Sequence, residues 1–112
     1  MAQHFLFQAA LTQPAWAHLA GHPEGEEARL RTLAQKAGGK LVSLFYSTGE
    51  HDVLAVLEAP DTNVASALSV ALSKAGHLQA VKTTTLFSND EGVAFLHKAG
   101  ALPFHAPQGM TV

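Results

Sequence analysis

The order of strand-like and helix-like segments predicts an α+β domain with one antiparallel sheet and helices on one face of it. Three observations support this prediction. The chain has 112 residues, a length that suits a single core. Runs with a period of two alternate with runs at helical spacing. The two central strand-like runs are separated only by Gly49 and Glu50, as in an antiparallel hairpin.

The first third of the chain is predicted to contain a strand followed by helix. Residues 4–11 place apolar side chains at every second position, which is typical of a strand, and residues 12–14 end the run. Residues 15–20 could form a short helical turn. Residues 24–37 carry leucine and alanine at helical spacing with glutamates in the first turns, and a Gly-Gly pair follows as a C-cap.

The middle of the chain supplies the remaining strands and a second helix. Residues 40–48 and 51–59 are the two strands of the hairpin. Residues 64–75 carry an apolar stripe at helical spacing that ends at Gly76, and residues 77–87 are rich in β-branched side chains, as strands are. The resulting order, β-α-β-β-α-β, is that of ferredoxin-like domains.

The C-terminal part adds a further helix. A capping-box sequence at residues 88–91 predicts a helix that runs to Lys98, and glycine and proline residues then end it. We therefore assign residues 1–100 to the ferredoxin-like domain and residues 101–112 to a C-terminal tail.

Both faces of the third predicted strand are apolar in the middle. Leu54 and Val56 share one parity, whereas Ala55 and Leu57 share the other. A sheet with one face in water alternates more cleanly than this. We therefore expect another copy of the chain to cover the second face, which makes the protein a homo-oligomer. The alternative is that the C-terminal helix and tail cover it.

The composition argues against several classes of protein. The formal net charge is -2, and lysine and arginine do not cluster, so the sequence carries no nucleic-acid footprint. The chain has no cysteine, which excludes disulfides and thiolate sites. The first residues lack the features of a signal peptide, and no apolar run is long enough to span a bilayer. We expect a cytoplasmic protein with neither a membrane nor a nucleic-acid partner.

Two stretches, GGKLVSLFYSTGEHDVLAVLEAPD and HLQAVKTTTLF, resemble the GYD-domain family. That family is named for a Gly-any-Tyr-Asp motif at the turn into the third strand. Here the motif reads Gly49-Glu50-His51-Asp52, with histidine in place of tyrosine. The resemblance implies a ferredoxin-like fold that associates sheet to sheet, as in dimeric α/β barrels. Related barrels include cofactor-independent oxygenases, isomerases, haem enzymes and small-molecule sensing domains, so the fold does not select a chemistry.

The motif allows a structural and a functional interpretation. As a turn, it uses Gly49 for a permissive backbone, while Asp52 accepts hydrogen bonds from turn amides or caps the strand. As a site, His51 and Asp52 are neighbours on a strand and point to opposite faces, so they cannot form a dyad with each other. His51 could exchange a proton or bind a metal or a ligand carboxylate, and Asp52 could act as a base if desolvated.

Two aromatic residues complete the candidates for ligand binding. Tyr46 lies in the same hairpin as His51 and could line a pocket there. Trp16 is interpreted as a plug between the first helix and the sheet and not as a stacking platform, since no basic groove accompanies it. The expected ligand-binding residues are Tyr46, Gly49, His51, Asp52 and Trp16.

Histidine is unusually frequent, with seven in the chain. His18 and His22 have the i, i+4 spacing of a metal-binding pair on a helix. Gly21 and Pro23 interrupt that helix, and exposed loop histidines are the competing interpretation. We therefore expect no metal and no other cofactor, and His18 and His22 are the candidates if a metal binds.

Three functions remain open. The first is a homo-oligomeric protein that binds a small organic ligand in a cleft between sheet and helices. The second is a cofactor-independent enzyme of the dimeric α/β-barrel type that uses His51 or Asp52 as acid or base. The third is a metal or haem binder that uses histidines. The first is favoured because it requires the fewest special residues.

Overall fold

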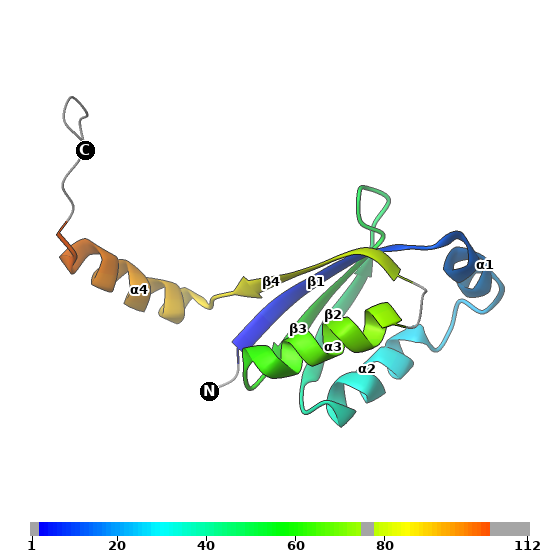
Figure 1. The fold of residues 1–112 in the computed structure, drawn as a ribbon, viewed down its shortest axis with the longest axis horizontal. Helices are drawn as coiled ribbons and strands as arrows, with labels where there is room; N and C mark the ends of the chain where they lie inside the picture. The colour runs from blue at the N-terminus through cyan, green and yellow to red at the C-terminus, as the bar shows by residue number, and fades with distance from the viewer. Residues whose placement is uncertain (1–2, 75–77, 104–112) are drawn as a thin grey trace.

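One antiparallel sheet of four strands organises the described part of the chain. The computed structural model describes residues 3–74 and 78–103. Its elements are β1 (Gln3–Leu11), α1 (Gln13–Gly21), α2 (Glu26–Lys36), β2 (Lys40–Tyr46), β3 (Val53–Ala59), α3 (Thr62–Lys74), β4 (Leu78–Leu86) and α4 (Asn89–Ala101) (Figure 1). The strands lie in the order β2-β3-β1-β4, and each neighbouring pair is antiparallel. This is the predicted ferredoxin-like fold, with α2 and α3 on one face and α4 added at the C-terminus.

The period-two pattern of β1 and β3 decides which face of the sheet is buried. Phe5 and Phe7 of β1 are buried, as are Ala55 and Leu57 of β3. In the register of the two strands, Phe7 lies opposite Ala55 and Phe5 lies opposite Leu57. Cross-strand neighbours on one face pack side by side, so these residues form a continuous apolar floor beneath the helices.

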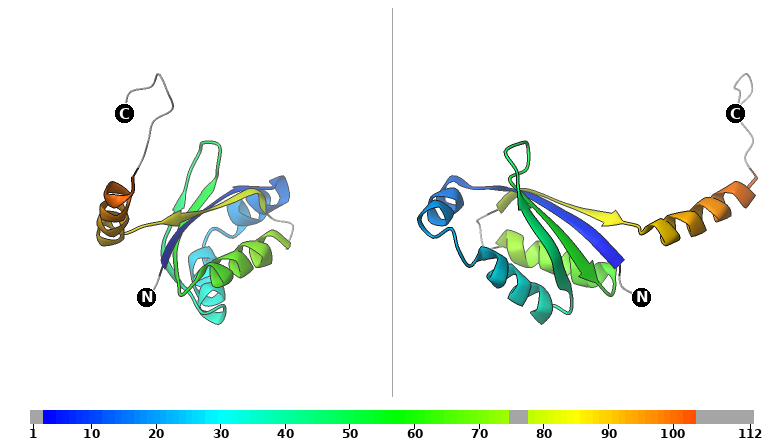
Figure 2. Two further views of the ribbon diagram at one scale, coloured as in Figure 1. Left: turned by 60° about the vertical axis from the view of Figure 1, so that its left-hand side comes forward. Right: turned by 180° about the vertical axis from the view of Figure 1, so that it is seen from behind.

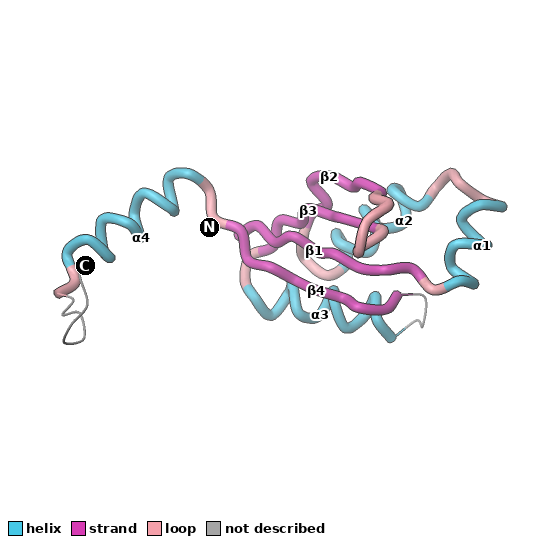
Figure 3. Tube along the Cα trace, turned by 90° about the horizontal axis from the view of Figure 1, so that it is seen from above, coloured by secondary structure: helices cyan, strands magenta, loops and turns pink. Residues whose placement is uncertain are grey.

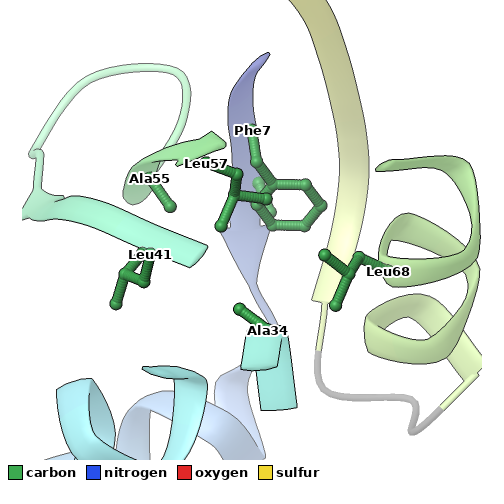
Figure 4. Close-up of a cluster of buried hydrophobic side chains, with 7 residues drawn as sticks. Phe7, Ala34, Leu41, Ala55, Leu57 and Leu68 are labelled. Carbon is green, nitrogen blue, oxygen red and sulfur yellow. The ribbon is translucent and has the colours of Figure 1, made fainter. Parts of the chain in front are cut away.

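Helices α2 and α3 close the core over that floor. Figure 4 shows Ala34 of α2, Leu41 of β2 and Leu68 of α3 gathered around Phe7, and each of the four is at most 3% exposed. Every buried side chain among the described residues is apolar. Truncating such a residue, for example Leu68 to alanine, costs about 2–5 kcal/mol of folding free energy.

Local backbone signals set the ends of the first two helices. The α1 helix extends over nine residues, longer than the predicted short turn, and the Thr12 side chain caps it by accepting a hydrogen bond from the Ala15 N–H (3.3 Å). The α2 helix starts at Glu26, later than predicted, because Gly25 holds a left-handed backbone with φ 93°. Gly38, with φ 94°, follows the end of α2 and confirms the predicted glycine cap.

The loop between β2 and β3 is longer than predicted. The predicted strands leave only a Gly-Glu pair between them, whereas residues 47–52 form the loop in the structure. The Ser47 N–H donates to the carbonyl oxygen of Asp52 (2.8 Å), and the Asp52 N–H donates to the carbonyl oxygen of Ala9 (2.9 Å). These bonds close the loop below its tip and hold it against β1.

The C-terminal helix begins with the predicted capping box and extends beyond its predicted end at Lys98, to Ala101. The predicted helix end at Gly76 and strand start at His77 lie outside the described residues. Among the described helices, none has the length and apolarity needed to cross a membrane.

The face of the sheet opposite α2 and α3 carries no described helix (Figures 2 and 3). We call it the open face. Leu6, Leu54 and Val56 are half-buried there, and Phe45 is 62% exposed. The α4 helix extends past the end of β4 and has no buried residue (Figure 1). The C-terminal helix therefore does not cover the open face of its own chain, and that alternative is wrong for α4.

Both edge strands depart from a regular ladder. The pairing of β2 with β3 shifts register between Leu41 and Ser43. The pairing of β1 with β4 shifts between Gln8 and Ala10, and Ala80 of β4 has a positive φ of 51°. Such bulges bend a strand and increase its local twist.

Candidate functional site

A cavity of about 310 Å³ lies between the sheet and the helices that cover it. The cluster shown in Figure 4 forms part of its wall. Further apolar side chains of the lining come from α1, α2, α3 and every strand, among them Leu11, Leu19, Leu30, Leu44 and Leu72. The cavity therefore offers a mainly apolar interior, which favours the hydrocarbon part of a ligand.

The polar side chains of the lining belong to four residues. They are His18 from α1, Glu26 and Arg29 from α2, and Tyr46 from the end of β2. The Arg29 Nε–H donates to Glu26 Oε2 at 3.2 Å, and a second bond joins Arg29 Nη2 to Glu26 Oε1. The Glu26 side chain is only 21% exposed and that of Arg29 is 65% exposed. The carboxylate thus lies deeper than the guanidinium that neutralises it.

Tyr46 places its phenol at this polar part of the cavity. In the β2–β3 register Tyr46 lies opposite Val53, which is buried, so its side chain is on the core side of the sheet. Its neighbour Phe45 is on the open face, because successive side chains along a strand point to opposite faces. Loss of solvation raises the pKa of Tyr46, and the negative charge of Glu26 raises it further. The phenol is therefore neutral near pH 7 and can donate a hydrogen bond to a ligand.

The two histidines of the predicted metal pair do come together. The rings of His18 and His22 are stacked, with centroids 4.8 Å apart and an angle of 24° between planes. His22 Nδ1 lies 3.3 Å from the carbonyl oxygen of His18. Within residues 3–74 and 78–103, no group of three or more His, Asp or Glu side chains is arranged to hold a metal ion. Only His18 of this pair lines the cavity.

The motif residues lie in the β2–β3 loop, outside the cavity lining. Asp52 Oδ2 accepts a hydrogen bond from the backbone N–H of Leu11 at 2.8 Å, so the carboxylate joins the loop to the end of β1. The Gly49 N–H donates to the Ser47 hydroxyl at 3.3 Å, within the exposed tip. His51 is half-buried beside Asp52 and also does not line the cavity.

Trp16 is also absent from the cavity lining. It lies on α1 and is 41% exposed. The α1 residues that face inward are Ala15, His18 and Leu19. Of the five ligand-binding candidates from the sequence, only Tyr46 reaches the cavity.

Three of the polar lining residues were not expected as ligand contacts from the sequence. Glu26 and Arg29 are an i, i+3 pair of opposite charge, which usually forms on a solvated helix surface. Here the charged pair lies next to the leucine-rich side of α2. A charged pair beside an apolar stripe on one helix is the sequence pattern that could have identified Glu26 and Arg29 as cavity residues. His18 was considered only as a metal ligand.

Comparisons with known proteins identify the family. No curated protein matches the chain. The crystal structure of MtbAldR matches with a TM-score of 0.58 and 15% sequence identity, over 80% of this chain and 55% of that one, so the chain spans about half the length of that protein. This likeness concerns the fold alone. The family model of the GYD domain matches residues 5–96. The motif loop, the fold and this match together establish that the chain belongs to the GYD-domain family.

Proposed function

We propose that the protein binds a small, largely apolar molecule with one polar group in the cavity between the sheet and helices α1–α3. One observation carries the proposal, namely a cavity of about 310 Å³ whose polar side chains are confined to His18, Glu26, Arg29 and Tyr46. Ligand sites in proteins are typically cavities of this size or larger, lined by apolar side chains with a few polar groups that fix orientation.

The lining suggests how such a ligand would lie. Each methylene group that leaves water for the leucine-rich interior contributes about 0.8 kcal/mol. The polar end would then meet the Tyr46 hydroxyl and the Glu26–Arg29 pair. Because Glu26 is the more buried member of that pair, a hydroxyl or amine group on the ligand finds an acceptor there.

Acid–base catalysis at His51 or Asp52 is not part of this proposal. The Asp52 carboxylate is hydrogen-bonded to the Leu11 amide, and neither residue lines the cavity. Of the histidine pair, His18 alone lines the cavity, so ligand binding there requires no metal.

Octanol, which has an apolar chain and a single hydroxyl, is a suitable probe of the cavity. We expect saturable NMR shifts of the methyl groups of Leu30, Leu44 and Leu72 in a titration of the isotope-labelled protein with octanol. Ala71→Leu enlarges a side chain of the lining, which fills part of the cavity and should weaken octanol binding at least tenfold. Ala67→Leu, on the exposed side of the same helix, is the matched control and should bind as the parent does.

The location of the shifts decides the outcome. Shifts confined to exposed apolar residues such as Leu96 and Phe45, with no response in the cavity, would refute ligand binding in the cavity. Equal affinity of Ala71→Leu and Ala67→Leu for octanol would also refute binding in the cavity. Circular dichroism of both variants verifies that each retains the fold.

We also propose that the protein is a homo-oligomer that uses the open face. The support is the exposed apolar surface there, which includes Phe45 at 62% exposure. A charge at Leu54 or Val56 should break the assembly and lower the mass measured by light scattering. Val70→Glu, on the exposed side of α3, is the control and should leave the mass unchanged.

A further inference from the structure

Helix α4 has an apolar half that the described residues leave largely exposed. On a helical wheel that half contains Asn89, Gly92, Val93, Phe95, Leu96, Ala99 and Gly100, and the other half contains Asp90, Glu91, Ala94, His97, Lys98 and Ala101. Leu102, the C-cap residue, follows the helix. No residue of α4 is buried, and Leu96 is 63% exposed. An isolated helix of 13 residues is marginal in water, so α4 needs a surface against which to bury its apolar half.

Contacts at the start of α4 direct it away from its own sheet. The Ser88 hydroxyl accepts from the Glu91 N–H (3.1 Å), and the Glu91 carboxylate accepts from the Ser88 N–H (2.9 Å). The ring of Phe87 lies edge-on to that of Phe95, with centroids 5.3 Å apart. These contacts fix the first turns of the helix to the end of β4, and α4 continues beyond the sheet (Figures 1 and 3).

The open face of the same chain has an apolar strip of matching chemistry. Phe45 lies opposite Leu54, and Val56 lies opposite Leu6 on the next strand. Four strands at their usual spacing of 4.8 Å span about 14 Å. The apolar half of α4 covers a similar distance, about 12 Å from residue 92 to residue 100 at 1.5 Å per residue.

The exposed apolar area is sufficient for a stable dimer. A standard interface buries about 800 Å² on each partner, of which roughly three-fifths is apolar. Phe45, Phe87 and Phe95 are 62%, 60% and 48% exposed. These three rings therefore hold roughly 300 Å² of exposed surface in each copy. Leu96, Leu102 and the half-buried side chains of the strip supply the remaining apolar area.

The charges of α4 favour a protein surface over a membrane. Helices that lie on membranes carry lysine and arginine on the polar half. The polar half of α4 has two acidic residues, Asp90 and Glu91, and a single lysine, Lys98. A second copy of the chain provides the apolar strip described above, and reciprocal exchange of one element between two copies closes a two-fold assembly.

We propose that α4 is exchanged between two copies of the chain, so that the apolar half of each α4 packs on the open face of the other copy. The inference rests on the homo-oligomer proposed above and identifies the element that covers the open face. It differs from sheet-to-sheet packing because α4 is then essential for assembly.

A pair of substitutions on opposite sides of α4 tests the exchange in the full-length protein. Leu96→Glu places a charge in the apolar half and should convert the dimer to a monomer in light scattering. Ala94→Glu places the same charge in the polar half and should retain the dimer. Both positions are exposed in the single chain, so neither change disturbs the core.

Cysteine cross-linking gives a second readout that does not require a weakened dimer. The chain has no native cysteine, so two copies with different tags can each carry one, Leu54→Cys in one and Leu96→Cys in the other. Exchange predicts a disulfide between the two copies under mild oxidation. Ala94→Cys in place of Leu96→Cys should give little product.

The results of these experiments distinguish exchange of α4 from an oligomer that forms by sheet-to-sheet packing. Loss of the dimer in Leu96→Glu alone, together with the Leu54–Leu96 cross-link, supports exchange. A Leu96→Glu protein of parental mass overturns it. If Leu54→Glu nevertheless dissociates that protein, the open face still mediates assembly and sheet-to-sheet packing replaces exchange. A monomeric parent refutes both proposals.

Discussion

Asp52 accepts a hydrogen bond from the backbone N–H of Leu11, with 2.8 Å between the two atoms, although the residues are 41 positions apart in the sequence. Leu11 ends β1 and lines the cavity, and Asp52 precedes β3. The motif aspartate therefore connects the β2–β3 loop to the strand that forms one wall of the cavity. The Asp52 side chain thus has a structural role, because its hydrogen bond holds the β2–β3 loop and the end of β1 in place.

Removing this carboxylate should destabilise the fold. Asp52→Ala leaves the partly buried Leu11 N–H without its acceptor, which costs about 1–3 kcal/mol. Asp52→Asn retains an acceptor oxygen and should cost less. Urea denaturation measures both, with Glu50→Ala at the exposed loop tip as the control. Equal stability of Asp52→Ala and Glu50→Ala would show that the hydrogen bond is not significant.

The protonation of Tyr46 can be measured alone, because it is the only tyrosine of the chain. Desolvation and Glu26 raise its pKa above the ordinary value of 10.0, so ultraviolet titration of the phenol should give a midpoint above that value. The folded state holds this proton more tightly than the unfolded state. The associated stability is thus fully present below pH 10 and is lost as the pH rises through the folded pKa.

Glu26→Gln should lower the Tyr46 midpoint, because it removes the negative charge and leaves Arg29 nearby. Glu27→Gln is the matched control, since Glu27 pairs with Arg31 (2.8 Å) instead. Equal midpoints in the two variants would show that Glu26 and Tyr46 do not interact at the cavity.

Gly39 should not tolerate a side chain. A Cβ atom at this position would lie 2.9 Å from the backbone carbonyl oxygen of Glu58, which cannot move without displacing β3. We expect Gly39→Ala to cost about 1–3 kcal/mol in thermal or urea unfolding. Gly21→Ala, where a Cβ meets nothing within 4 Å, should be neutral or slightly stabilising. If Gly39→Ala unfolds like the parent, β2 and β3 are less closely packed there than described.

Acid should loosen the start of α4. The Ser88 N–H donates to the Glu91 carboxylate and lowers its pKa below the ordinary value of 4.5. The capping interaction is therefore complete above pH 4.5 and is lost as the pH falls through the lowered pKa. NMR of the Ser88 amide should follow this titration. Glu91→Gln should remove the pH dependence, whereas Asp90→Asn should retain it.

The parts of the fold that depend on local periodicity could be predicted from the sequence. The alternation of Phe5 and Phe7 identified the core side of β1, and a Gly-Gly pair marked the end of α2. The length of the β2–β3 loop could not be predicted, because the partner of Asp52 is a backbone amide on another strand. No local pattern around the motif encodes that contact.

The candidate site was predicted only in part for a similar reason. Tyr46 was expected to line a pocket because it lies in the same hairpin as His51, and in the structure it lines the cavity without that histidine. Glu26 and Arg29 line the cavity because of the orientation in which α2 packs on the sheet. His18 lines it because of the position of α1. These placements depend on how whole helices pack, which residue spacing within one segment does not determine.

The register shifts in the two edge strands have a consequence for the behaviour of the protein at high concentration. A straight edge strand presents a regular row of free N–H and C=O groups that another chain can extend, and this is how amyloid-like fibrils grow. The shift beside Leu41 in β2 and the positive φ of Ala80 in β4 interrupt that row at each edge. We therefore expect that concentrated protein does not form fibrils by adding strands at the edges of the sheet.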